Sequence, residues 1–151
     1  MAGKPRLLVP LDGSPLAEGA LAEAATLARA LNAEVLLLQV IAPAADVIRS
    51  GTMTISVDEV WAAEREEALR YLNRIRARPE WAGITMTSLV ELGTAADMIL
   101  DVARARQVDR IVMTTHGRTG VTRWVFGSVA EKVLRAAECT VVLVRSEATL
   151  T

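Results

Sequence analysis

The chain has 151 residues, with 17 basic and 18 acidic side chains and a formal net charge of -1 at pH 7. That length is typical of one domain with one hydrophobic core, so we expect a single domain over residues 1–151. The balanced charge excludes the basic surface that nucleic acid or an anionic membrane attracts. No apolar run approaches the ~18 residues of a spanning helix or forms a signal peptide, so we expect a cytoplasmic protein.

The first third of the chain predicts two buried strands with a helix between them. Arg6–Leu11 and Glu34–Ile41 are apolar runs of the kind found in parallel strands that are covered on both faces. The segment Asp12-Gly13-Ser14-Pro15 predicts a turn, an N-cap serine and a proline at the first helical position. We therefore expect one helix over residues 15–31.

The middle of the chain predicts a loop and a second helix. Residues 43–57 show no hydrophobic period and mix Pro, Gly, Ser and Thr, which is typical of a long loop. Ser56 and Glu59 then have the spacing of a capping box. A stripe of apolar residues follows at helical spacing and predicts a helix that ends near Pro79. The stripe consists of Trp61, Ala68, Leu69, Leu72 and Ile75.

The last part of the chain repeats the alternation of strands and helices. Residues 83–91 predict a strand, and Thr94 with Asp97 predicts a capped helix after it. That helix has an inner face of Ile99, Leu100 and Ala103. Residues 109–114 and 140–145 predict two more strands, with a helix over 129–137 between them. This alternation predicts an α/β domain in which helices cover both faces of a parallel sheet.

Cys139 is the only cysteine and His116 the only histidine. A lone cysteine excludes an intrachain disulfide, and its apolar surroundings favour a structural role. His116 has no cysteine or carboxylate motif beside it, so we expect it to pack or bond within its loop and not to hold a metal ion. We assign no catalytic role to either residue.

The segment between the last two predicted strands carries the clearest functional signal. Gly117 and Gly120 follow a strand, and Gly127 with Ser128 opens a helix. Such a loop offers backbone N–H groups and the positive end of a helix dipole to an anion such as phosphate. Neither G-x-x-x-x-G-K-[ST] nor G-x-G-x-x-G occurs in the chain, which excludes two common phosphate-binding loops.

This segment resembles the nucleotide loop of the universal stress protein family. The family has Gly-x-His-Gly or a similar sequence, then nine residues, then Gly-Ser or Gly-Thr; this chain has Thr114-Thr115-His116-Gly117 and Gly127-Ser128 at that spacing. Thr114 stands where the motif has its first glycine. Residues 8–14 and 140–145 are similar to the family's opening and closing strands. The resemblance implies a Rossmann-like, open five-stranded parallel sheet in the order 3-2-1-4-5, with a crevice between strands one and four.

The resemblance also implies a ligand, which is ATP with Mg²⁺. It places Pro10, Leu11 and Asp12 along the nucleoside, and the backbone of Val40 against the adenine. The loop would wrap the phosphates, and the Ser128 hydroxyl would reach a phosphate or a bound cation. The remaining residues that it assigns to the site are Met113, Thr114, His116, Gly117, Arg118, Gly120, Gly127 and Val129.

Several of these residues have structural alternatives. Ser128 and Glu131 have the spacing of a capping box whether or not phosphate binds. Asp12 also fits a turn in which its carboxylate accepts the N–H of Ser14. The loop glycines fit an ordinary loop with positive φ angles. These alternatives stay open at the level of sequence.

We interpret the chain as an ATP-binding module of stress response or signalling. Two alternatives are a dimeric interaction module that binds no nucleotide and a slow ATPase of the adenine nucleotide α-hydrolase type. Residues 12–15 do not supply the Ser-Gly-Gly-x-Asp loop of such hydrolases. A two-component receiver is a third alternative because Asp12 lies at a strand end, but Arg145 stands where a receiver has lysine. No general base is visible beside the loop, so hydrolysis should be slow or absent. The apolar strand 140–145 predicts a sheet edge that pairs in a homodimer.

Overall fold

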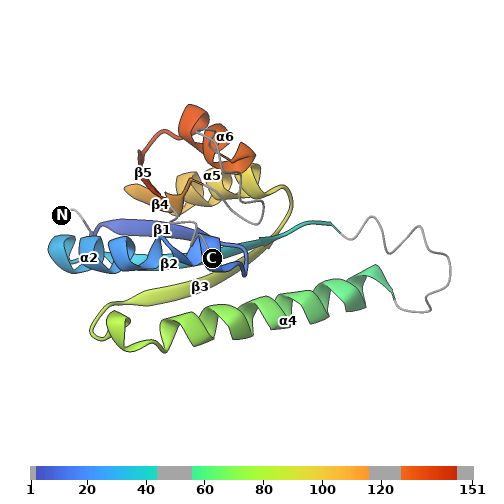
Figure 1. The fold of residues 1–151 in the computed structure, drawn as a ribbon. Helices are drawn as coiled ribbons and strands as arrows, with labels where there is room; N and C mark the ends of the chain where they lie inside the picture. Colours follow the sequence, from blue (N-terminus) through green and yellow to red (C-terminus); the bar gives the residue numbers. More distant parts are fainter. Residues whose placement is uncertain (1–2, 44–55, 116–126, 146–151) are drawn as a thin grey trace, which may run out of the picture.

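A computed structural model of the chain describes residues 3–43, 56–115 and 127–145. Over these residues the chain forms a five-stranded parallel sheet in the order β3-β2-β1-β4-β5 (Figure 1). The strands are β1 (Arg6–Leu11), β2 (Glu34–Ile41), β3 (Met86–Leu92), β4 (Arg110–Thr114) and β5 (Thr140–Val144). Both the fold class and the strand order expected from the sequence are confirmed.

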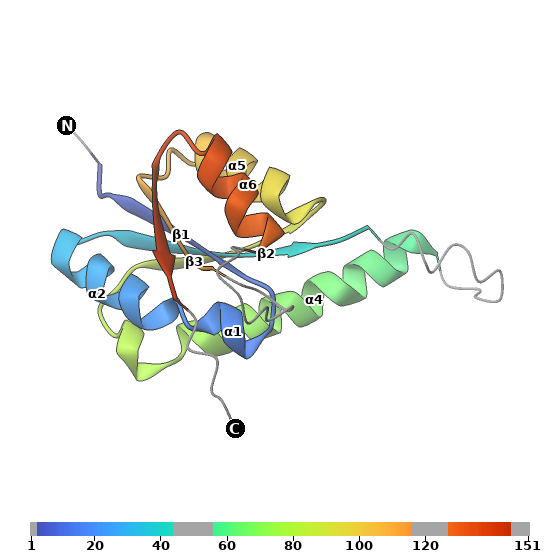
Figure 2. The same cartoon turned by 45° about the horizontal axis from the view of Figure 1, so that its top comes forward.

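Helices cover both faces of this sheet, as Figures 1 and 2 show. They are α1 (Pro15–Glu18), α2 (Leu21–Leu31), α4 (Val57–Arg76), the short 3-10 helix η1 (Pro79–Trp81), α5 (Ala95–Ala105) and α6 (Ser128–Ala136). Side chains alternate along each strand, so Leu7 and Val9 pack beneath α2 and α4 while Leu8 packs beneath α5 and α6. The sheet therefore separates two apolar layers, and the site must lie at one of its ends.

The expected single helix over residues 15–31 is wrong, because the chain forms α1 and α2 with a turn between them. The N–H of Gly19 bonds to the carbonyl of Leu16, and that of Ala20 bonds to the carbonyl of Ala17, so the ladder tightens to a three-residue spacing. Glycine also favours this ending because it is a poor helix former. The apolar spacing continues from Ala17 to Leu21, which is why the sequence pattern did not show the break.

Some helices begin with a side-chain hydrogen bond from the N-cap residue, and others begin without one. The hydroxyl of Ser14 accepts the N–H of Ala17 at 3.2 Å, and that of Ser56 accepts the N–H of Glu59 at 3.2 Å, as expected. The predicted capping box at Thr94 is wrong, because Thr94 makes no side-chain cap bond. Its proposed partner, Asp97, instead pairs with Lys132 of α6 at 2.7 Å.

The remaining expectations for the described helices and strands hold with small shifts, whereas most of the loop expected over residues 43–57 lies outside the described residues. Ala68, Leu72 and Ile75 of α4 are buried, and Trp61 and Leu69 pack against the same core. β3 begins three residues later than expected, after a turn in which Gly83 has a φ of +80°. The bounds of β4, α6 and β5 each differ from the expected ones by one residue. Cys139 is half-buried, and burial raises the pKa of its thiol, which agrees with a structural role.

None of the helices in the described ranges combines the length and apolar character that a membrane crossing needs. The longest, α4, has 20 residues, and charged side chains cover much of it.

Candidate functional site

The sheet opens between β1 and β4. These strands pair only at Leu7 with Arg110 and at Leu8 with Ile111, whereas β1 follows β2 over its whole length. On the other side of the gap, β4 stays paired with β5 as far as Thr114. The carboxyl ends of β1 and β4 therefore separate at the point where the strand order reverses. Ligands of open α/β sheets bind at this kind of point.

A cavity of about 260 Å³ lies at this opening. Nine of the residues assigned to the site from the resemblance line it, and they come from the ends of three strands and the start of α6. They are Pro10, Leu11, Asp12, Val40, Met113, Thr114, Gly127, Ser128 and Val129. Segments that lie far apart in the sequence thus meet around one hollow.

Six further lining residues were missed by the sequence reasoning: Ala17, Leu38, Ala95, Ile99, Thr115 and Ala130. Leu38 lies two residues before Val40 on the same face of β2, so strand alternation could have indicated it. Ala95 and Ile99 carry no signal of their own, because their place depends on how α5 packs across the sheet. Both lie on the first two turns of that helix.

The other four assigned residues, His116, Gly117, Arg118 and Gly120, lie outside the described residues. The structure does describe the two ends of their segment. The N–H of Gly127 donates to the carbonyl of Thr115 at 2.7 Å, and the N–H of Thr115 donates to the carbonyl of Val144 at 3.1 Å. Thr115 and Gly127, the described residues on either side of 116–126, therefore both lie in the cavity wall.

Two helices begin at the cavity, and no side chain caps either of them. Ala95 starts α5 and Ser128 starts α6, and both residues line the hollow. The predicted capping role of Ser128 is wrong, because Gly127 occupies the N-cap position and Ser128 lies one residue inside the helix. The first-turn N–H groups of an α-helix need partners, and together with the helix dipole they favour an anion or a hydrogen-bond acceptor.

Asp12 is held at the edge of the cavity by the turn that follows β1. Its Oδ1 accepts the N–H of Ser14 at 2.9 Å, which is the turn bond expected as an alternative to ligand binding. Gly13 adopts a φ of +84° in this turn, a conformation that favours glycine. The turn fixes the position of a carboxylate that also lines the cavity, so the two roles are compatible.

The polar side chains at the end of β4 are buried. Thr114 is 5% exposed and Thr115 is 9% exposed. Met113 packs in the layer beneath α5 and α6, and Val112 in the layer beneath α2 and α4. Strand alternation therefore directs the Thr114 side chain to the side of α1 and α2, away from Met113. Ala17 of α1 also lines the cavity, so the departure of Thr114 from the family motif adds bulk on that side of the hollow, away from the wall that Met113 and Ile99 form.

The described lining is suited to binding. Leu38, Val40, Ile99 and Met113 offer an apolar wall, and Asp12 is the one titratable side chain among the described lining residues. The described ranges also contain no group of His, Cys, Asp and Glu side chains that would hold a metal ion directly. An apolar wall beside a carboxylate and an uncapped helix start fits a ligand with a flat apolar ring, hydroxyl groups and an anion.

Comparison with known proteins agrees with this architecture. A sequence model of the universal stress protein family matches residues 5–145. The universal stress protein MJ0531 of Methanocaldococcus jannaschii is 32% identical over 142 residues, which cover 93% of this chain and 81% of that protein.

Solved structures share the fold over nearly the whole chain. Protein MJ0577 of Methanocaldococcus jannaschii superposes with a TM-score of 0.80 at 28% identity, covering 95% of this chain and 97% of that one. A universal stress protein in complex with cAMP gives a TM-score of 0.66 at 19% identity, covering 96% and 99%. One from Archaeoglobus fulgidus in complex with dAMP gives 0.63 at 22%, covering 95% and 98%. From its sequence match and its fold, the chain belongs to the universal stress protein family.

Proposed function

We propose that this protein binds adenine nucleotides, and ATP with Mg²⁺ in particular, and that it acts as a nucleotide-dependent module of stress response or signalling. One observation carries the proposal. The cavity where β1 and β4 separate combines an apolar wall, the Asp12 carboxylate and the uncapped start of α6. These three features correspond to the base, the ribose and the phosphates of a nucleotide.

In this proposal the adenine packs against Val40 and Met113, and Asp12 accepts hydrogen bonds from ribose hydroxyls. The N–H groups at the start of α6 receive the phosphates, together with the glycines of residues 116–126. The Ser128 hydroxyl, which does not cap its helix, would hold Mg²⁺ together with phosphate oxygens. When bound, the ion neutralises part of the phosphate charge.

Two proteins that share this fold are complexes with cAMP and dAMP, so the fold accommodates adenine nucleotides. Their sequence identity to this chain is below 25%, and the proposal therefore depends on the lining residues of this chain. Hydrolysis is expected to be slow or absent, because the one titratable group among the described lining residues is Asp12, which the turn already engages.

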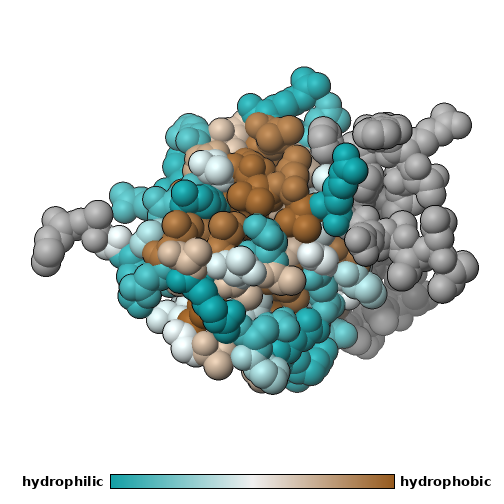
Figure 3. Space-filling view, turned by 60° about the vertical axis from the view of Figure 1, so that its left-hand side comes forward, coloured by the Kyte–Doolittle hydropathy of each residue, from teal (hydrophilic) through white to brown (hydrophobic). Residues whose placement is uncertain are grey.

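We also propose that the protein forms a homodimer through β5. This strand is one edge of the described sheet, and Val141, Val142, Leu143 and Val144 are only half-buried in the single chain. Hydrophobic side chains gather on the side of the molecule that Figure 3 brings forward. A bare apolar strand edge tends to pair with another chain. The cytoplasmic location expected from the sequence stays a prediction.

The experiment that tests this proposal is mass spectrometry of nucleotide released from the purified protein, followed by titration with ATP, ADP, AMP and cAMP. We expect adenine nucleotide to copurify, and we expect Mg²⁺ to tighten binding of ATP more than of AMP. Binding of none of the four would favour the alternative, a dimeric interaction module without a nucleotide.

A further inference from the structure

The helix α1 has only four residues, and it contacts both the cavity, through Ala17, and α4, through Glu18. At its start, Ser14 links it to the cavity, because the Ser14 hydroxyl bonds to Asp12 at 2.5 Å and caps Ala17 at 3.2 Å. Both Asp12 and Ala17 line the cavity. A helix of one turn has little stability of its own, so its position must be set by contacts with the rest of the fold.

The other end of α1 is bonded to α4 and to the segment after it. The hydroxyl of Tyr71 donates to Glu18 Oε2 at 3.0 Å, and Arg78 Nη2 donates to Glu18 Oε1 at 2.6 Å. Each oxygen of the Glu18 carboxylate thus has its own donor, and the side chain is only 21% exposed. Charge-assisted bonds to both oxygens hold the carboxylate in one orientation.

Because α1 and α2 are separate helices, α1 is held by contacts of its own. The buried Ala17 packs it on the core, and Glu18 bonds its end to Tyr71 and Arg78. The bonds of Glu18 cross 53 residues to Tyr71 and 60 residues to Arg78, so they join α1 to a distant part of the chain. The helix α1 is therefore bonded to the cavity turn through Ser14 at its start and to α4 through Glu18 at its end.

We propose that Glu18 is a positioning residue of the nucleotide site, which holds α1 against α4 so that Asp12 and Ala17 keep their places in the cavity wall. This inference rests on the proposed function and deepens it. Glu18 does not line the cavity, so it acts through α1 and not through contact with the ligand. Without its carboxylate, the α1 turn would shift and the ligand would have to restore its geometry on binding.

Tyr71 reports on this contact because it is the only tyrosine in the chain. Burial, and then the hydrogen bond and charge of Glu18, raise the pKa of Tyr71 above its ordinary value of 10.0, while the nearby Arg78 lowers it and Asp12 raises it. The phenol therefore stays protonated at neutral pH and keeps donating to Glu18. The contact should break only in alkaline solution, as the pH rises through the raised pKa.

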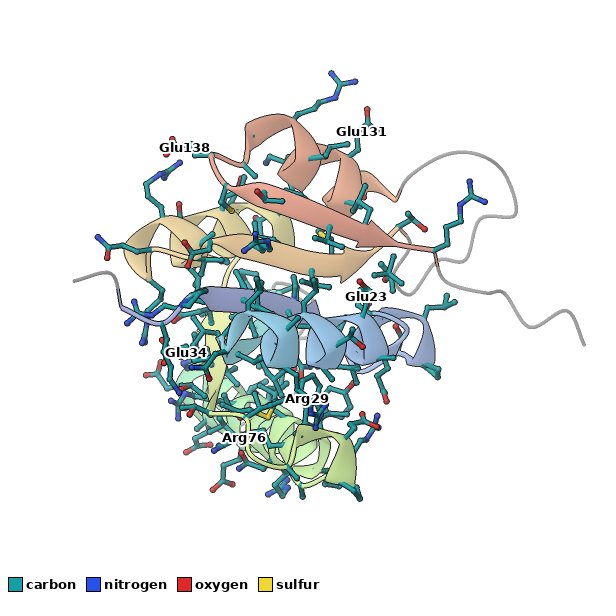
Figure 4. The ribbon with its side chains drawn as sticks, turned by 90° about the vertical axis from the view of Figure 1, so that its left-hand side faces the viewer. Glu23, Arg29, Glu34, Arg76, Glu131 and Glu138 are labelled. Atoms are coloured by element: carbon teal, nitrogen blue, oxygen red, sulfur yellow. The ribbon has the colours of Figure 1, made fainter. Side chains whose placement is uncertain are left out.

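The chain also offers a matched control at the opposite end of the sheet. Arg6 pairs with Glu34, and their side chains are 41% and 25% exposed, against 41% and 21% for Arg78 and Glu18. Glu34, labelled in Figure 4, begins β2 at the amino end of the sheet. Removing either carboxylate deletes the same kind of ion pair at nearly the same exposure, but only Glu18 belongs to a helix with a residue, Ala17, in the cavity wall.

The test compares the wild type with Glu18→Ala, Glu18→Gln and Glu34→Ala. We expect Glu18→Ala to weaken ATP binding by about tenfold and Glu34→Ala by less than about twofold. Glu18→Gln keeps an acceptor for Tyr71 and should recover part of the affinity. The phenolate absorbance of Tyr71 should appear at lower pH in Glu18→Ala than in the wild type, and at the wild-type pH in Glu34→Ala.

Equal losses of ATP affinity in Glu18→Ala and Glu34→Ala would overturn the inference. They would leave the proposed function intact, since the wild type would still bind ATP. An unshifted Tyr71 titration in Glu18→Ala would also overturn it. If Glu18→Ala does not fold, Tyr71→Phe takes its place in the binding comparison, because it removes one hydroxyl from the same contact. A wild-type protein that binds no ATP would instead contradict the proposed function itself.

Discussion

The two ends of the gap between β1 and β4 differ in how they are closed. At the amino end, the N–H of Arg6 donates to Asp109 at 2.8 Å, the N–H of Asp109 returns to the Arg6 carbonyl at 2.9 Å, and the two strands pair. At the carboxyl end the strands stop pairing after Leu8 and Ile111, and a cavity takes the place of the ladder. The same two strands thus pair at one end and border the candidate binding cavity at the other.

The two ends also differ in the backbone bond that an aspartate makes there. Asp109 closes the amino end by accepting a backbone N–H from the opposite strand. Asp12 accepts a backbone N–H from its own turn, at the end where β1 and β4 no longer pair. A carboxylate that bonds to its own turn helps to fix the shape of that loop, which teaches that the same residue type can join two strands at one end and shape the cavity edge at the other.

The largest expected effect concerns stability at the closed end. Ile111→Ala removes a fully buried side chain from the point where β1 and β4 still pair, and it should lower the free energy of unfolding by about 2–5 kcal/mol. Met113→Ala, at the open end, should cost less stability and should weaken ATP binding. Urea denaturation monitored by circular dichroism measures the loss of stability. Equal losses of stability in the two variants would contradict the difference between the paired end and the open end.

The next effect concerns the two aspartates. Asp12→Ala should weaken ATP binding by about tenfold or more, because it removes an acceptor for the ribose and the bond that holds the turn. Asp109→Ala removes an aspartate with a similar backbone bond at the closed end, so it should lower stability without a specific loss of affinity. Calorimetric titration of both variants checks this. Normal affinity in Asp12→Ala would remove that residue from the site.

A smaller effect concerns the two edges of the sheet. Val142→Lys on β5 should convert the proposed dimer into a monomer, because a charge on an edge strand opposes pairing. Thr87→Lys is the control, since Thr87 is exposed on β3, the opposite edge. Light scattering gives the mass of each variant. A wild-type protein that is already monomeric would show that β5 does not pair in solution.

The smallest effect is expected at Thr114. Because strand alternation directs its side chain toward α1 and away from the apolar wall proposed to hold the adenine, Thr114→Gly should change ATP affinity by less than about threefold and mainly reduce stability, by about 1 kcal/mol. Thr114→Ser, which keeps the hydroxyl, is the matched variant. A large gain in affinity in Thr114→Gly would show that the side chain obstructs the ligand after all.

Strands and their order were predictable from the sequence because their signals are local or carried by the family resemblance. Apolar runs marked β1 and β2 to the residue, and the motif around Gly127 and Ser128 indicated the crevice. The break between α1 and α2 was not predictable, since Ala17 and Leu21 continue one helical stripe across it. The capping boxes failed for two different reasons. Thr94 occupies the N-cap position of α5 but makes no side-chain cap bond, and Ser128 lies one residue inside α6 because Gly127 is the N-cap.

The candidate site residues that belong to the family motif or to strand ends were predictable from the sequence. Those that reach the cavity only through the packing of a helix were not. Pro10, Asp12 and Val40 lie at strand ends, which meet at one edge of any parallel sheet. Ala95 and Ile99 reach the cavity only because α5 crosses the sheet at that place. Glu18 and Tyr71 meet across 53 residues, and no spacing in the sequence indicates such a contact.

The most direct test of the central claim is calorimetric titration of ATP with Mg²⁺ into the wild type and into Gly127→Val. Gly127 has φ −57° and ψ 155°, which a valine also adopts, so the fold should remain while the β-branched side chain obstructs the start of α6. Gly3→Val, at an exposed glycine with open space around it, is the control. We predict ATP binding by the wild type and the control and none by Gly127→Val; equal affinity in all three would contradict the account.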